Sequence, residues 1–124
     1  MQVINMNSLA LAYIGDAIYE VHIRKYLLDK GIVKVHELQK NAVNFVSAKN
    51  QSKFLKEMID NNFFNEQEIS VIMRARNNKG SSHPKNTDIL TYKHATALEA
   101  VIGYLYLDNQ LDRVDEIMKY IIGE

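Results

Sequence analysis

Hydrophobic residues recur along this chain mostly at helical spacing, and no long segment alternates between apolar and polar residues as a half-buried strand would. This periodicity predicts an all-α fold. One Pro and five Gly interrupt the pattern, and we find neither an internal repeat nor a low-complexity linker. A chain of 124 residues buries one core, so we expect a single domain over residues 1–124.

Capping residues and glycines set the expected helix boundaries. Asn7 is a candidate N-cap, Gly31 lies just past the end of the same helix, and Asn65 with Glu68 has the pattern of a capping box. The segment 77–88 has turn chemistry throughout and is expected to be a loop. We expect helices over about residues 8–29, 35–45, 48–59, 65–76, 92–107 and 112–122. The last of these has one apolar side, formed by Val114, Ile117, Met118 and Ile121.

Two acidic residues stand alone in segments that are otherwise apolar. Residues 9–19 read LALAYIGDAIY, with Asp16 as the one charge, and residues 95–107 read ATALEAVIGYLYL, with Glu99 as the one charge. Helices that are apolar nearly all round are typical of central helices. A carboxylate held among apolar residues is costly in free energy unless a cation, a proton, hydrogen bonds or a metal compensates it.

Two interpretations of these acids remain open. In the structural one, each acid caps a neighbouring helix or pairs with a Lys or Arg of another helix. In the functional one, Asp16 and Glu99 share a divalent ion. The chain has no Cys, and its His residues do not have the spacing of metal ligands, so the ligands would be carboxylate oxygens. Such ligands suit Mg²⁺ or Mn²⁺.

Glycines lie beside both acids. Gly15 precedes Asp16, and Gly103 follows Glu99 by one helical turn. Glycine inside a helix is destabilising by about 1 kcal/mol relative to Ala, and it is tolerated where another backbone comes close. We therefore expect both helices to cross a neighbour tightly beside their acids.

Charge is segregated along the chain although its total is zero, with 15 basic and 15 acidic residues. Residues 74–94 hold five basic residues and one acid, a net charge of +4, which favours phosphate contact. A solvated surface loop is the simpler alternative. Few aromatic residues occur there, so duplex RNA fits better than a single strand stacked on aromatic rings.

The candidate RNA-binding residues are Arg74, Arg76, Asn77, Asn78, Lys79, Ser81, Ser82, Lys85, Asn86 and Thr87. Three lysines on one face of the helix over 48–59 extend this surface: Lys49, Lys53 and Lys56.

The chain shows no sign of export or membrane insertion. Its first residues lack a basic patch followed by an apolar core. No apolar run approaches the ~20 residues that a membrane-spanning helix needs. We expect a soluble cytoplasmic protein.

Several motifs, in order along the chain, resemble the ribonuclease III family. LALAYIGDAIYE at residues 9–20 resembles the signature helix of its catalytic domains, and KNTDILTYKHATALEAVIGYLYLD at 85–108 resembles the helix with the second acidic cluster. VSAKNQS at 46–52, RARNNKGSSHPKNTD at 74–88 and the overall length look like the Mini-ribonuclease III branch, which lacks a double-stranded-RNA-binding domain. The resemblance covers nearly the whole chain.

The resemblance implies an all-helical endonuclease domain that works as a homodimer, with two active sites flanking a valley for duplex RNA. The implied reaction is Mg²⁺-dependent phosphodiester hydrolysis that leaves 5′-phosphate and 3′-hydroxyl ends. In this branch the substrate is the precursor of 23S ribosomal RNA, trimmed at both ends of the mature species. Without an accessory RNA-binding domain, target choice is expected to need RNA shape or a ribosomal protein bound to the substrate.

Carried over by motif, Asp16 matches the signature aspartate and Glu99 matches the metal-binding glutamate. Two further family acids are absent, because Ala12 and Thr96 stand where longer ribonuclease III enzymes have Glu and Asp. Mini-ribonuclease III sequences resemble this chain at both positions. Two alternatives to the nuclease function remain open. The chain could be a non-catalytic double-stranded-RNA-binding homologue that has lost part of the acidic cluster, or a helical dimerisation module whose acids are structural.

Overall fold

The structure, a computed structural model, describes residues 2–79 and 88–123. Over these residues the chain is helical and contains no strand, so the all-α prediction is confirmed. No helix within these ranges is both long enough and apolar enough to cross a membrane. A short 3₁₀ helix, η1 (Val3–Asn5), is followed by α1 (Ser8–Asp29), α2 (Val35–Val46), α3 (Ala48–Asp60), α4 (Glu66–Arg76), α5 (Ile89–Leu107) and α6 (Leu111–Ile122).

The predicted caps explain why most helix boundaries agree. The Asn7 side chain accepts hydrogen bonds from the N–H groups of Leu9 and Ala10 at 2.8 and 3.2 Å, and the Asn65–Glu68 capping box is present. The start of α5 was predicted three residues too late. Asp88 caps this helix by accepting from the Thr91 N–H at 2.9 Å, so α5 begins before its continuous apolar pattern.

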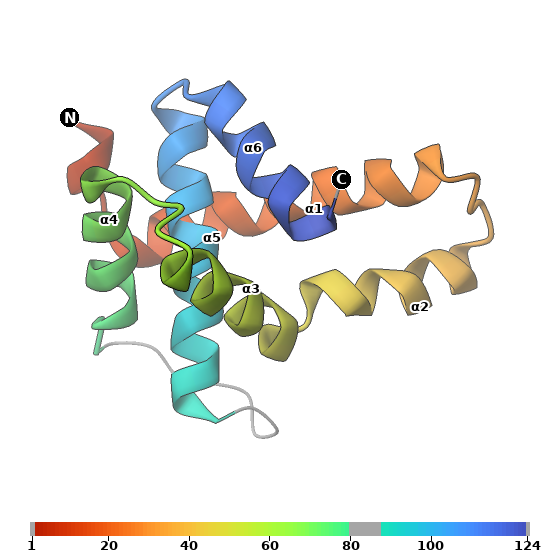
Figure 1. Cartoon of the computed structure of the whole chain (residues 1–124), viewed down its shortest axis with the longest axis horizontal. Helices are drawn as coiled ribbons and strands as arrows, with labels where there is room; N and C mark the ends of the chain where they lie inside the picture. The colour runs from red at the N-terminus through yellow and green to blue at the C-terminus, as the bar shows by residue number, and fades with distance from the viewer. Residues whose placement is uncertain (1, 80–87, 124) are drawn as a thin grey trace.

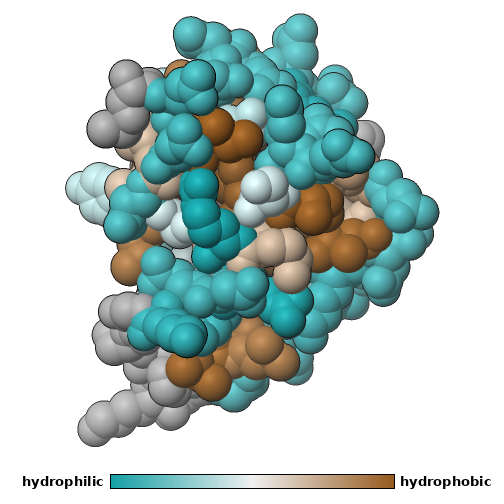
Figure 2. Space-filling model, turned by 90° about the vertical axis from the view of Figure 1, so that its left-hand side faces the viewer, coloured by the Kyte–Doolittle hydropathy of each residue, from teal (hydrophilic) through white to brown (hydrophobic). Residues whose placement is uncertain are grey.

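Helix α5 is the centre of the molecule, with α1, α3, α4 and α6 packed against it (Figure 1). Every residue from 94 to 105 is buried except Glu99. The far half of α1 leaves this bundle and pairs with α2, which has no fully buried residue. Seen from the side of the N-terminal segment and α4, the surface shows apolar patches separated by hydrophilic side chains (Figure 2).

Helices α1 and α5 meet backbone to backbone. A Cβ atom added to Gly15 would lie 1.7 Å from the carbonyl oxygen of Glu99, and one added to Gly103 would lie 1.9 Å from the carbonyl oxygen of Leu11. Neither position has room for a methyl group, which confirms the expected tight crossing. The crossing brings Asp16, the residue after Gly15, beside Glu99.

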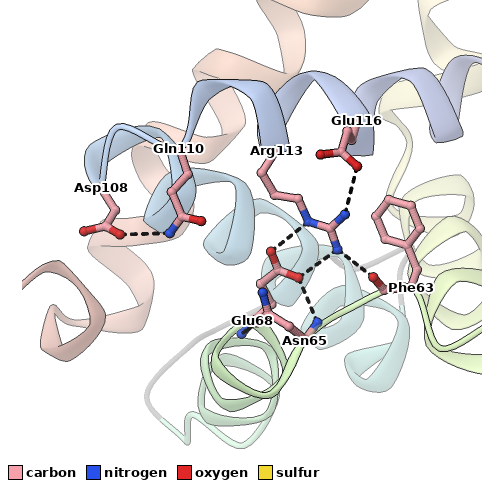
Figure 3. Close-up of polar contacts among 7 residues, drawn as sticks. All are labelled: Phe63, Asn65, Glu68, Asp108, Gln110, Arg113 and Glu116. Atoms are coloured by element: carbon pink, nitrogen blue, oxygen red, sulfur yellow. Dashed lines mark hydrogen bonds and ion pairs between the residues drawn. The ribbon is translucent and has the colours of Figure 1, made fainter.

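A buried ion pair ties α4 to α6 (Figure 3). Glu68 is 1 % exposed, and its two carboxylate oxygens accept from Arg113 Nε and Nη2 at 2.8 and 2.9 Å. Arg113 Nη2 also donates to the Phe63 carbonyl oxygen at 2.6 Å, and the guanidinium lies 4.3 Å from the Phe63 ring centroid. Glu68 therefore has its charge compensated and its oxygens hydrogen-bonded inside the fold.

Breaking this pair should destabilise the protein. We expect Glu68→Gln to lower the free energy of unfolding by roughly 3 kcal/mol, because it leaves the exposed Glu116 as the one carboxylate that pairs with the guanidinium. Thermal unfolding followed by circular dichroism measures the effect. Glu116→Gln is the matched control, and we expect it to change the free energy by less than about 0.5 kcal/mol. Equal effects of the two substitutions would contradict a structural role for Glu68.

Candidate active site

The crossing of α1 and α5 brings the two lone acids together. The side chains of Asp16 and Glu99 are close enough to share a hydrogen bond. Across residues 2–79 and 88–123, neither carboxylate forms an ion pair with Lys, Arg or His. Pairing with a basic residue of another helix, the second form of the structural interpretation, therefore has no counterpart in this part of the chain. Neither acid is the N-cap or C-cap residue of a described helix, so the capping form has none either.

Asp16 departs from one expectation. We expected both acids to be held among apolar residues, and this is wrong for Asp16, which is exposed, whereas Glu99 is partly buried. Helix α1 is buried on one side only, and its other side presents apolar residues such as Tyr13 to solvent. An apolar helix with an exposed face has the same sequence pattern as one that is covered all round, so the pattern could not tell the two apart.

The Glu99 carboxyl is electrostatically strained. Its pKa is raised to about 8, with burial as the largest cause, followed by the charge of Asp16 and the hydrogen bond between the two acids. The charge of Glu20 adds to this effect, while the Gln51 amide lowers the pKa by donating to Glu99. The negative form of Glu99 therefore lacks a positive partner.

These residues fit a divalent cation. Two adjacent carboxylates without a basic partner repel each other, and a divalent ion between them would offset that repulsion. No group of three or more His, Asp or Glu residues in the described part of the chain is arranged to hold a metal. The protein thus offers two carboxylates, and an ion that keeps several waters, as Mg²⁺ does, matches this donor set.

The candidate RNA-binding residues divide into three groups. Arg76 ends α4, and Asn77, Asn78 and Lys79 follow it. The guanidinium of Arg74 instead lies against the N-terminal segment. Ser81, Ser82, Lys85, Asn86 and Thr87 lie outside the described residues.

Each nitrogen of the Arg74 guanidinium has a partner within the protein. Its guanidinium donates to the carbonyl oxygens of Ile4 and Met6 at 2.6 and 2.9 Å and to Ser8 Oγ at 3.3 Å. These bonds attach the N-terminal segment to α4. They give this exposed arginine a structural role, and its contact with RNA stays a prediction.

A second basic helix face lies near Arg76. His94 of α5 is buried, and Ser52 Oγ of α3 lies 3.5 Å from its Nδ1. Burial is the largest cause that lowers the pKa of His94, followed by the positive charges of Lys56 and Arg76, and Asp88 opposes them. Lys56 of α3 and Arg76 of α4 therefore both lie near enough to His94 for their charges to act on it. The surface expected from Lys49, Lys53 and Lys56 stays a prediction.

Comparison with known proteins agrees with this geometry. The family model described as the ribonuclease III domain matches residues 9–110. The Mini-ribonuclease 3 of Clostridium tetani is 48 % identical over 95 % of this chain and 78 % of its own length, and that of Enterococcus faecalis is 41 % identical over 94 % and 89 %. A crystal structure of a Fusobacterium nucleatum protein superposes with a TM-score of 0.85 at 37 % identity, covering 96 % of this chain and 93 % of that one.

The chain belongs to the ribonuclease III family. The expected resemblance to the Mini-ribonuclease III branch is confirmed, and so is the helical fold. Membership makes the chain an endoribonuclease of the ribonuclease III type, the type that acts on double-stranded RNA.

Ala12 and Thr96, where the resemblance implies acids in longer ribonuclease III enzymes, are both buried here. Glu20 and Gln51 are the residues near the two acids that our sequence reasoning missed. Glu20 carried a signal, because it lies one helical turn after Asp16. It also pairs with Arg24 at 2.8 Å. Gln51 lies in the branch motif VSAKNQS but is uncharged, so an argument from isolated charges overlooked it.

The raised pKa of Glu99 predicts how stability depends on pH. Between the ordinary value of 4.5 and about 8, the folded protein holds a proton that the unfolded chain releases, so stability falls as pH rises through this window. Glu99→Gln should remove this dependence and raise the melting temperature in EDTA increasingly toward high pH. Thermal unfolding between about pH 5 and pH 9 measures it, with the exposed Glu57→Gln as control. A constant difference between Glu99→Gln and the wild type would contradict the prediction.

Proposed function

We propose that this chain, as a single catalytic domain over residues 1–124, is a Mg²⁺-dependent endoribonuclease that matures the 5′ and 3′ ends of 23S ribosomal RNA in the cytoplasm. The observation that carries the metal dependence is the contact between Asp16 and Glu99, two carboxylates from crossing helices with no basic partner among the described residues. The ribosomal substrate follows from the resemblance to the Mini-ribonuclease III branch.

The two acids have complementary positions. Asp16 is exposed and can meet a phosphodiester, and Glu99 is anchored in the central helix. Both carboxylates would hold Mg²⁺, or Mn²⁺ in its place, with waters completing the coordination. When bound, the metal lowers the pKa of a coordinated water and stabilises negative charge on the scissile phosphate. No side chain then has to act as the nucleophile, and the products carry 5′-phosphate and 3′-hydroxyl ends.

Basic side chains beside this centre would hold the RNA. Arg76, Lys79 and Lys56 would contact phosphates of the duplex without reading its sequence, and Asn77 and Asn78 add neutral hydrogen-bonding groups. Ser81, Ser82, Lys85, Asn86 and Thr87 remain in the proposal on the sequence pattern alone. A ribosomal protein bound to the precursor is the proposed source of precise target choice.

An exposed apolar stripe on α1 supports a homodimer. Tyr13 is 83 % exposed and Val21 is 61 % exposed, and Leu9 and Ala17 continue the same spacing of four residues. Leaving this stripe in water is unfavourable, and a second copy would cover it. The molar mass in solution tests this proposal, and a monomer at micromolar concentration that stays fully active would contradict it.

The catalytic assignment predicts that Asp16→Asn folds normally and loses cleavage. We expect the rate on a structured ribosomal RNA precursor to fall by about 100-fold or more, because one of two metal ligands is lost. Mapping of the cut ends measures cleavage, and thermal unfolding checks the fold. The exposed Asp112→Asn on α6 is the matched control. An unchanged rate in Asp16→Asn, or undiminished wild-type cleavage in EDTA, would contradict the assignment. Wild-type binding without cutting in Mg²⁺ would favour the non-catalytic homologue.

The RNA surface predicts a change in salt dependence. Replacing both Arg76 and Lys79 by Ala should weaken duplex binding and reduce the slope of log affinity against log salt by about 2, since roughly one phosphate contact is lost per residue. Binding titrations at several salt concentrations measure the slope. Lys25→Ala on the far half of α1, where Lys25 pairs with Asp29, is the control. An unaltered slope would remove the two residues from the interface.

A further inference from the structure

The side chain of Gln51 is polar, uncharged and almost completely buried. It lies on α3 with 4 % exposure, and its Nε2 donates to Glu99 Oε2 at 3.4 Å. Burying an amide is unfavourable unless its polar atoms find partners, so an apolar residue would be the default at a position that only fills the core. The position of this amide against an acid of the active site calls for an explanation.

Glu99 is approached from two different helices. Asp16 of α1 reaches it across the glycine crossing, and Gln51 of α3 reaches it from the packed interface between α3 and α5. The crossing fixes the backbone of Glu99, but the side chain keeps three rotatable bonds. A hydrogen bond from a buried donor restricts those rotations and reduces the entropy lost when the carboxylate binds a ligand.

The neighbouring residue holds the donor in place. Ser52 follows Gln51 on α3, is also buried, and contacts His94 of the same central helix. Helix α3 is therefore attached to α5 by two adjacent polar side chains. The hydrogen bond of the Ser52 side chain is to His94 and to neither acid, which makes Ser52 a matched reference for Gln51.

The chemistry of an amide suits this place better than that of a lysine or arginine. A basic residue against Glu99 would neutralise the carboxylate and compete with a cation for it. An amide N–H orients the carboxylate and leaves its negative charge available.

We propose that Gln51 is a positioning residue that holds the Glu99 carboxylate toward Asp16, so that the two acids form a cation site before the cation arrives. This inference rests on the proposed function, because it concerns the same pair of acids. It assigns to α3 a part in the active site beyond its basic outer face.

The experiment compares Gln51→Met, which keeps the length of the side chain and removes the donor, with Ser52→Ala as the control. The first readout is the shift of melting temperature produced by MgCl₂ without RNA. The second is the Mg²⁺ concentration that gives half-maximal cleavage of long duplex RNA. We expect Gln51→Met to reduce the first and to raise the second about tenfold, with KM for RNA unchanged. Ser52→Ala should change the melting temperature and leave both Mg²⁺ responses unaltered.

A second variant keeps the test decisive if Gln51→Met fails to fold. Gln51→Glu has the same shape and adds a third carboxylate, so it should lower the melting temperature in EDTA and enlarge the rise produced by MgCl₂. Wild-type Mg²⁺ responses in Gln51→Met, the same shift in Ser52→Ala, or no enlarged rise in Gln51→Glu would overturn the role of Gln51. Failure of the wild type itself to respond to MgCl₂ would instead overturn the metal site, and with it the proposed function.

Discussion

The backbone contact between α1 and α5 is the constraint on which the rest of the structure depends. Gly15 and Gly103 lack the atoms that would separate the two helices, and each lies against a carbonyl oxygen of the other helix. Because an α-helix is rigid over these few residues, the contact also fixes the residues next to it. The crossing of their backbones brings Asp16 and Glu99 together.

Two carboxylates in this fold show that burial by itself does not indicate function. Glu68 is the more deeply buried, yet Arg113 and the Asn65 N–H satisfy both of its oxygens, so it stabilises the fold. Glu99 is less buried, but a like charge and a neutral amide are the polar neighbours that act on it most strongly. What distinguishes Glu99, the proposed metal ligand, is the missing positive charge, because only an uncompensated carboxylate keeps its affinity for an added cation.

Sequence reasoning predicted the features that depend on residues close together in the chain, and it missed the features that depend on contacts between distant elements. Caps such as Asn7 and the Asn65–Glu68 box act within a few residues of the chain, so the starts of α1 and α4 could be predicted directly from the sequence. The glycines beside the acids predicted the crossing because a close approach leaves few other residues possible. The exposure of Asp16, the bonds of Arg74 to the N-terminal segment and the contact from Gln51 each depend on how helices pack in three dimensions, and no spacing along one helix encodes them.

Under the proposed function, two protein carboxylates serve where the resemblance implies that longer enzymes of the family have more. Each additional acid near Glu99 would add repulsion that the metal-free fold has to bear, and Glu20 already contributes some. Buried Ala12 and Thr96 add no charge at their positions. A neutral donor such as Gln51 then orients the remaining acid without increasing the repulsion. In a domain of this size, whose total stability is small, orienting fewer acids well is less destabilising than crowding more of them together.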